Sequence, residues 1–246
     1  MGNKEGIVPH LKKLFDGGFF HILFGGSLTK IIAFFSSIVI VRFVSKNDYG
    51  LLSYADNIYS YIYLITGIGF DYAVLKYCVF DNDSKNKAIF NFALKIGSAV
   101  EIAIIVAAVT ISLLFIPEEF VNARIYIYAL ILYPFLYYWI ALSLAFIRAR
   151  QMTKEYAYAG IIQSAIVFFV SIGLIFFINA FSVIVARYVG AIIVIIYCSK
   201  KIIPYFKGCI KISLTSGEKK KFIVFARRSS RPIWAKRRAE PWLIHY

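Results

Sequence analysis

The chain has 246 residues, of which 60% are hydrophobic with glycine left out and 17% are charged, and its mean hydropathy is +0.71. Soluble domains average roughly 45–50% apolar and about 25% charged residues, so this composition excludes a water-soluble globular domain. It also excludes a disordered chain, because 23 Phe and 18 Tyr are too many for a solvated polymer. The composition therefore predicts an integral membrane protein.

The charge balance and the cysteines narrow the class of partner. Lys and Arg total 28 against 13 Asp and Glu, which gives a net charge of +15. In a membrane protein this excess is typical of cytoplasmic loops near anionic lipid, so we expect membrane lipids as partners and no nucleic acid. The three cysteines, Cys78, Cys198 and Cys209, have no metal or redox spacing.

Residues 1–21 are predicted to form an amphipathic cytoplasmic N-terminus. Val8 and Leu11 recur at helical spacing beside Lys12 and Lys13, which indicates a short helix lying on the membrane surface. A plain basic loop is the alternative.

Residues 22–197 are predicted to form a lobe of six transmembrane helices. A spanning helix needs about 20 mostly apolar residues to cross roughly 30 Å of hydrocarbon. Six stretches reach or approach that length: 22–44, 51–70, 88–115, 125–147, 157–178 and 181–197. We expect a tight turn at Asn179 and Ala180, because one continuous helix through the last two stretches would be far longer than a bilayer is thick.

The basic residues of the short loops predict the orientation. If both ends of the lobe are cytoplasmic, only Arg42, Lys46 and Arg124 lie outside. The basic residues that then lie inside are Lys4, Lys12, Lys13, Lys76, Lys85, Lys87, Arg148, Arg150, Lys154, Lys200, Lys201, Lys207 and Lys211. This imbalance predicts that the N- and C-termini are both in the cytoplasm.

The chain changes character after the sixth predicted helix. Residues 198–221 are predicted to be a basic interfacial segment with a short amphipathic helix, because Ile203, Phe206 and Ile210 recur at helical spacing beside Lys207 and Lys211. A plain basic loop is again the alternative. A seventh apolar helix begins at Phe222, but residues 226–246 contain five Arg and one Lys, whereas the preceding sequence favours Lys. We hypothesise that 222–246 is an aborted helix with an out-of-frame tail; a genuine basic tail bound to lipid headgroups is the alternative.

Ionisable residues inside a bilayer are costly and usually face a cavity or a partner, so they are the candidate site residues. In the first span, Gly26, Lys30, Ala33 and Ser37 are spaced so that they share one helix face. Lys30 either lines a cavity or reaches the headgroups from a helix-packing face.

The second span carries a longer polar pattern. Asp56, Ser60, Tyr63, Gly67 and Asp71 fall at i, i+4, i+7, i+11 and i+15, which predicts a single polar face. Aromatic rings and hydroxyl groups suit a sugar path, so Asp56, Tyr63 and Asp71 are candidate substrate ligands. An aromatic belt at the membrane interface is the alternative explanation for the tyrosines.

The third and sixth spans supply three further candidates. Lys95 and Glu101 are six residues apart and do not share a helix face; they are the candidate ion-coupling residues. For Glu101, proton coupling and a structural hydrogen bond between helices are both open. Arg187 is a candidate phosphate ligand, because a guanidinium binds phosphate oxygens in a bidentate way, and outward snorkelling is its alternative.

Signatures of catalysis are missing from the sequence. It has no Walker loop, no nucleophile elbow and no His/Cys ligand cluster. We therefore predict that the protein is not an enzyme and needs no metal or other cofactor.

Several segments carry a resemblance to a known family. They are Gly25-Gly26 with Lys30, the loop from Arg42 to Gly50 with its Arg-x-x-Ser-x-x-Asp-Tyr-Gly pattern, the segment from Gly67 to Tyr77, and Arg148-Ala-Arg150 before Tyr156. Over residues 15–221 the chain resembles the N-terminal half of the bacterial polysaccharide flippases (O-antigen translocases, Wzx-type), which belong to the multidrug-exporter-like superfamily.

The resemblance implies a two-lobed fold, of which this chain would supply one lobe. It also implies that the protein moves an undecaprenyl-pyrophosphate-linked oligosaccharide across the bacterial cytoplasmic (inner) membrane by alternating access, for O-antigen (lipopolysaccharide) or capsule synthesis. A glycan polymerase and glycosyltransferases are then the expected protein partners. Lys30, Arg42 and Arg187 would hold pyrophosphate or acidic sugars.

The length departs from that pattern. Six helices build one lobe, so we expect that the chain does not transport by itself unless it dimerises or a second polypeptide supplies the other lobe. Two other functions stay open: a small-molecule or drug exporter of the same superfamily, and a non-transporting scaffold for glycan-assembly enzymes.

Overall fold

The computed structural model describes residues 19–79, 82–210 and 212–229, and in these ranges every regular element is a helix. In chain order they are α2 (Phe19–Phe43), α3 (Lys46–Ile65), η1 (Thr66–Gly69), α4 (Phe70–Tyr77), α5 (Asp83–Leu114), η2 (Glu118–Ala123), α6 (Arg124–Ala129), α7 (Tyr133–Ala149), α8 (Thr153–Ile178), α9 (Phe181–Phe206) and α10 (Ser216–Ser229). Most of the predicted amphipathic N-terminus and of the predicted out-of-frame tail lies outside the described residues.

The helices confirm the predicted class of all-α integral membrane protein. Five helical stretches are long and apolar enough to cross a membrane, and a sixth is counted if 118–129 and 133–149 form one bent span. Their apolar side chains are widely exposed: in the most apolar window of α2 only 6% of the residues are buried. Such exposure suits helices whose solvent is lipid.

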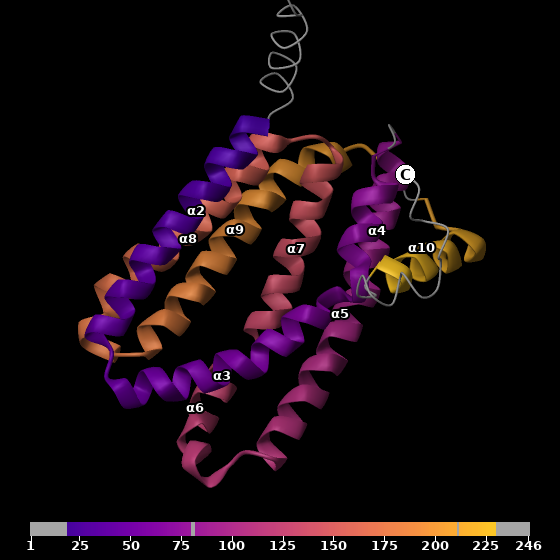
Figure 1. The fold of residues 1–246 in the computed structure, drawn as a ribbon. Coiled ribbons are helices and arrows are strands. Elements are labelled where there is room, and N and C mark those ends of the chain that lie inside the picture. Colours follow the sequence, from indigo (N-terminus) through magenta and orange to yellow (C-terminus); the bar gives the residue numbers. More distant parts are fainter. Residues whose placement is uncertain (1–18, 80–81, 211, 230–246) are drawn as a thin grey trace, which may run out of the picture.

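Figure 1 shows how the helices are arranged. α2, α8 and α9 lie side by side, α7 packs next to α9, and α4 and α5 lie on the other side of α7. α3 crosses obliquely from the end of α2 towards α4 and α5. α7 is the central helix, because it contacts α9, α4, α5 and α8 and fully buries Tyr138, Leu142 and Phe146.

Charged side chains join the helix ends at one end of the bundle. Arg150, directly after α7, lies 3.3 Å from the carboxylate of Asp83 in α5, and Lys201 in α9 lies 3.8 Å from Glu155 in α8. The start of α2 is at the same end (Figure 1). We call this the basic end, and its residues are those that the loop charges predict to be cytoplasmic.

A polar clamp joins three segments at the opposite end. Ser45 caps the start of α3, with its hydroxyl accepting from the N–H of Asp48 at 3.1 Å and donating to the carboxylate at 2.8 Å. The same carboxylate accepts from the amide of Asn179 at 2.6 Å and from the hydroxyl of Tyr126 at 3.1 Å. The Ser and Asp of the family-like loop therefore fix α3 to α6 and to the turn between α8 and α9.

The second predicted span is broken, so its predicted single polar face is wrong. Gly67, Ile68 and Gly69 have φ values of 66°, 42° and 77°, in the left-handed region, and they end the path of α3 before α4 begins. Glycine adopts this conformation without a Cβ penalty, which explains the break. Asp71 lies beyond the break in α4, so it does not continue the face of Asp56.

The fourth predicted span, 125–147, is also not one straight helix. Its two parts, Glu118–Ala129 and Tyr133–Ala149, meet at an angle of 48°. Pro134 has no N–H to donate to the carbonyl of Leu130, which instead accepts from Tyr133 at 2.9 Å in a tighter turn. The helical ladder is thereby interrupted.

The predicted boundaries after residue 197 also differ from the structure. α9 runs unbroken to Phe206, so the separate interfacial helix predicted in residues 198–221 is wrong over its first part. The helix predicted to begin at Phe222 begins at Ser216, because Thr215 and Glu218 form a capping box one turn after the basic loop. The frameshift hypothesis for the tail stays a prediction.

Candidate functional site

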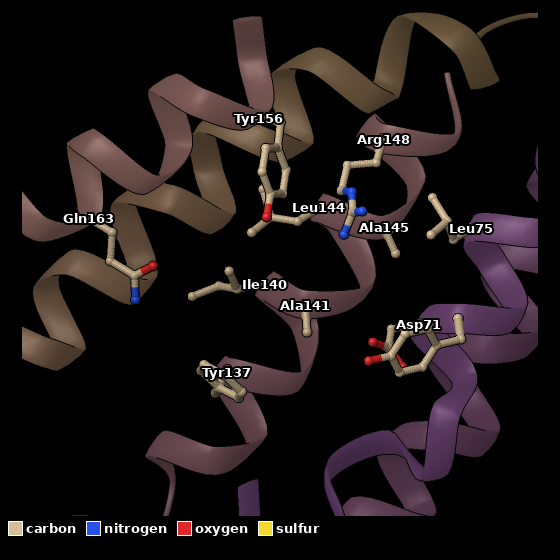
Figure 2. A pocket seen from close by; sticks show the side chains of 11 residues that line it. Asp71, Leu75, Tyr137, Ile140, Ala141, Leu144, Ala145, Arg148, Tyr156 and Gln163 are labelled. Carbon is tan, nitrogen blue, oxygen red and sulfur yellow. The ribbon is translucent and has the colours of Figure 1, made fainter. Parts of the chain in front are cut away.

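A cavity of about 300 Å³ lies between α4, α7 and α8. Figure 2 shows it with the side chains that line it. Its polar residues are Asp71 on α4, Arg148 near the end of α7, and Tyr156 and Gln163 on α8. Its remaining lining residues are Tyr72, Leu75, Tyr137, Ile140, Ala141, Leu144 and Ala145. We call it the α4–α8 cavity.

Helix periodicity explains why the α7 side chains of this lining lie on one face. Tyr137, Ala141, Leu144 and Arg148 fall at i, i+4, i+7 and i+11 of α7 and so form one stripe. The small side chains of Ala141 in this stripe and of its neighbour Ala145 leave the space, while Arg148 lies at its basic end. Asp71 reaches the cavity because the break at η1 lets α4 start in a new direction.

Two opposite charges face the cavity without forming an ion pair with each other. Figure 2 shows the carboxylate of Asp71 and the guanidinium of Arg148 pointing into it from different helices. In the part of the chain that the structure describes, neither has an ion-pair partner within 4 Å, and Arg148 lies 5.3 Å from the ring centre of Tyr156. A guanidinium binds phosphate oxygens, a carboxylate accepts from hydroxyl groups, and a tyrosine ring covers apolar faces. The cavity suits a polar ligand that carries both hydroxyl and anionic groups.

A second polar centre lies between α3 and α9. Arg187 forms a bidentate pair with Asp56, with nitrogen–oxygen distances of 2.5 and 2.8 Å. Two predicted site residues from distant parts of the sequence thus meet, and the guanidinium is already engaged by a carboxylate. Arg187 also lines a smaller cavity of about 270 Å³ that includes Ser36, Ser37, Ser164 and Tyr133.

Tyr63 lies between the two polar centres. Its ring centre is 5.0 Å from that of Tyr137, which lines the α4–α8 cavity, and 6.2 Å from that of Tyr133, which lines the smaller cavity. Its hydroxyl is buried and has no hydrogen-bond partner among the described residues. A buried donor without a partner costs free energy, but Tyr63 lines neither cavity, so a ligand reaches this hydroxyl only if the neighbouring tyrosines move.

Glu101 holds the break in the second span. One carboxylate oxygen accepts from the backbone N–H of Gly67 at 2.9 Å, and the other accepts from the hydroxyl of Thr66 at 3.3 Å. The residue is fully buried, so these bonds satisfy polar groups that the unwound segment exposes. This geometry supplies the interhelical hydrogen bond that was one of its two predicted roles.

Three predicted site residues are not brought to either cavity. Lys30 and Arg42 are exposed on α2, and Lys95 is exposed on α5, away from the buried Glu101. Within the described ranges, no three His, Cys, Asp or Glu side chains are grouped closely enough to hold a metal ion.

Sequence reasoning missed Arg148, Tyr156 and Gln163 as site residues. Arg148 was counted only as a loop charge, although it stands next to Tyr156 in a segment of the family resemblance. The sequence does indicate Gln163, because it is a polar amide in the middle of a predicted span. Polar groups inside a bilayer, like ionisable ones, are costly and usually face a cavity or a partner.

Comparison with known proteins identifies a family. A family model described as "Polysaccharide biosynthesis protein" matches residues 16–232, a range that includes every described helix. No curated protein and no solved structure matches the chain.

Proposed function

The chain belongs to the polysaccharide biosynthesis protein family, and we propose that it binds lipid-linked oligosaccharide repeat units, carried on undecaprenyl pyrophosphate, for translocation across the bacterial cytoplasmic membrane. The multi-pass helical structure agrees with a role in the membrane steps of polysaccharide synthesis. The observation that carries the proposal is the α4–α8 cavity, where a carboxylate and a guanidinium face the same space and neither forms an ion pair with another described residue.

In this proposal, the two charged groups contact different parts of the ligand. Arg148 at the basic end binds a pyrophosphate oxygen or an acidic sugar, because a charge-assisted bidentate contact is strong where water is scarce. Asp71 accepts hydrogen bonds from sugar hydroxyl groups, and Gln163 both donates and accepts. Tyr156 stacks on a sugar face.

The other predicted residues fit a path rather than one pocket. A second polar site beside the smaller cavity is formed by the Asp56–Arg187 pair and by Tyr63, whose hydroxyl has no hydrogen-bond partner among the described residues. Lys30, exposed on α2, faces the second lobe that completes a transport cavity, whereas Arg42, twelve residues further along α2, points about 120° away from it round the helix. Glu101, which accepts hydrogen bonds from the bend at η1, is the proposed ion-coupling residue, and Lys95 is a second candidate.

The test is ligand binding by the purified protein in phosphatidylcholine nanodiscs, with a fluorescent polyprenyl-pyrophosphate-linked oligosaccharide as the probe. Loss of a hydrogen bond to a charged group costs about 1.5–3 kcal/mol, so Arg148→Ala is expected to weaken binding at least tenfold. Asp71→Asn is expected to weaken it severalfold. Lys200→Ala and Glu119→Gln are matched controls, since both residues are exposed and neither lines the cavity. Unchanged affinity in both cavity variants would contradict the proposal.

A separate proposal concerns transport itself. A cavity between two lobes needs two lobes, and the described helices build one. We therefore expect the 246-residue chain in liposomes to bind the probe without moving it between leaflets, and addition of a second lobe to restore movement. Movement by a monomeric chain alone would refute this expectation.

A further inference from the structure

A groove runs along the membrane-facing side of α2 and α8, separate from the α4–α8 cavity. It encloses about 350 Å³. Its lining residues are His21, Phe24, Gly25, Ser27, Leu28, Ile31, Lys154, Ala157, Tyr158 and Ile161. We call it the α2–α8 groove.

The groove arises from two matched helix stripes. On α8, Lys154, Ala157, Tyr158 and Ile161 fall at i, i+3, i+4 and i+7. On α2, residues 21, 24, 25 and 28 follow the same spacing. The two helices start at the same end and lie side by side (Figure 1), so the stripes face a common space along their length.

A close contact between the helices forms the floor. A Cβ added to Gly25 would lie 2.7 Å from the Cβ of Ala157, so only glycine permits the two backbones to approach this closely. The larger side chains of Phe24, Leu28 and Ile31 on α2 line the groove beside that contact. Phe24 is 69% exposed and Ile31 is 52% exposed, so the walls of the groove open towards the surrounding lipid.

The groove is apolar along its length and cationic at its mouth. Lys154 supplies a positive charge at the basic end beside His21, and none of the described residues that line the groove is a carboxylate. Glu155, the neighbour of Lys154, lies instead near Lys201 on α9 at 3.8 Å. Among the described residues Lys154 has no carboxylate within 4 Å, so its ammonium group can attract an anionic group at the membrane surface.

The dimensions suit one hydrocarbon chain of the cytoplasmic leaflet. Ten residues separate His21 from Ile31, which corresponds to roughly 15 Å along a helix, or about half of the hydrocarbon thickness. An apolar slot of that depth below a cationic mouth matches a lipid with a phosphate at its head.

We propose that the α2–α8 groove binds the isoprenoid chain of the carrier lipid, with Lys154 and His21 on its phosphate groups. This inference rests on the function proposed above. Lys154 and Tyr156 are two residues apart at the start of α8, on opposite sides of a helix about 10–12 Å wide. The lipid chain stays outside the lobe in the groove, while the glycan passes over the start of α8 into the α4–α8 cavity.

Photolabelling tests the assignment. The probe is a polyprenyl phosphate with a diazirine in its second isoprene unit, added to the purified protein in phosphatidylcholine nanodiscs, and labelled peptides are identified by mass spectrometry. We expect labels within residues 21–31 or 154–161. Lys154→Ala and Ile31→Trp are expected to reduce labelling at least fivefold, the first by removing the charge and the second by filling the groove. Lys200→Ala and Ile38→Trp, at exposed positions outside the groove, are the matched controls and should change labelling less than twofold.

Competition separates the carrier lipid from bulk lipid. Unlabelled polyprenyl phosphate should displace the probe, whereas phosphatidylglycerol and phosphate-free polyprenol should do so at least tenfold less well. Equal competition by phosphatidylglycerol would overturn the assignment and identify a general phospholipid site. Labels spread over all spans, or labelling unaffected by Lys154→Ala and Ile31→Trp, would overturn it as well.

The inference about the groove and the proposed function of the cavity can fail separately in these experiments. If glycan binding depends on Arg148 but the probe labels other helices, the inference about the groove fails and the proposed function stands. If the groove is labelled but the oligosaccharide does not bind, the proposed function fails.

Discussion

Breaking the ion pair between Asp56 and Arg187 should destabilise the lobe more than breaking the pair between Glu155 and Lys201. The two bonds of the pair are 2.5 and 2.8 Å long, and the side chains are 34% and 24% exposed, respectively. Removing one partner of a fully buried pair costs about 3–5 kcal/mol, whereas exposed pairs contribute roughly 0.2–1 kcal/mol. The burial of this pair is intermediate, so we expect a coupling free energy of about 2 kcal/mol.

A double-mutant cycle measures this coupling. In Asp56→Ala the guanidinium is left without its carboxylate, and in Arg187→Ala the carboxylate is left without its cation. For a protein of this size, about 2 kcal/mol corresponds to a fall of roughly 4–8 °C in Tm for each single variant. The double variant is expected to lose much less than the sum, because it leaves neither charge uncompensated. Thermal unfolding in one detergent, followed by intrinsic fluorescence, gives the values.

The pair between Glu155 and Lys201 serves as the control cycle. Its atoms are 3.8 Å apart and its side chains are 27% and 43% exposed, so its coupling should not exceed about 1 kcal/mol. Strict additivity of the Asp56 and Arg187 variants, or a coupling no larger than in the control, would refute the reasoning from burial and bidentate geometry.

Three further predictions concern packing, the helix break and pH. Gly97→Ala should lower the free energy of unfolding in detergent by about 1–3 kcal/mol or more, because the added Cβ would lie 1.8 Å from the Tyr138 hydroxyl. The control Gly173→Ala, which has open space around it, should be neutral or slightly stabilising. Equal effects of the two variants would contradict the packing argument. Glu101→Leu leaves the buried backbone N–H of Gly67 without an acceptor and should lower the free energy of unfolding by about 1–3 kcal/mol. Glu101→Gln keeps an acceptor and should lower it less. The reverse order in Tm would contradict the role of Glu101 as the acceptor for this N–H. Hydrogen bonds from Lys85 and Thr215 lower the pKa of Glu218 to about 2. Their contribution to the attachment of α10 should therefore be fully present above the ordinary pKa of 4.5 and weaken as the pH falls towards 2. Hydrogen exchange of the α10 amides should show this pH dependence in the wild type and not in Glu218→Gln.

The family and the class of protein were readable from the sequence. The resemblance drawn from the Gly25-Gly26, Arg42–Gly50 and Gly67–Tyr77 segments is confirmed by the family match. Membrane helices are unusually predictable, because a backbone in hydrocarbon must satisfy its own hydrogen bonds and side chains must be apolar over a fixed length. Gly67 and Gly69 belong to the segments that carry the family resemblance. The periodicity argument nevertheless continues one helix across them to Asp71, although glycines can end a helix.

Only the tertiary structure decided which residues form the site. Periodicity relates side chains within one helix, so it grouped Asp56 with Asp71, which the break at η1 separates. It had no means of pairing Asp56 with Arg187, 131 positions away, or of bringing Arg148 and Gln163 to face Asp71. Those contacts depend on how one helix is rotated and bent against another. In a lobe whose helices are apolar almost all round, the sequence specifies the length of each helix far more strongly than the direction in which its few polar side chains point.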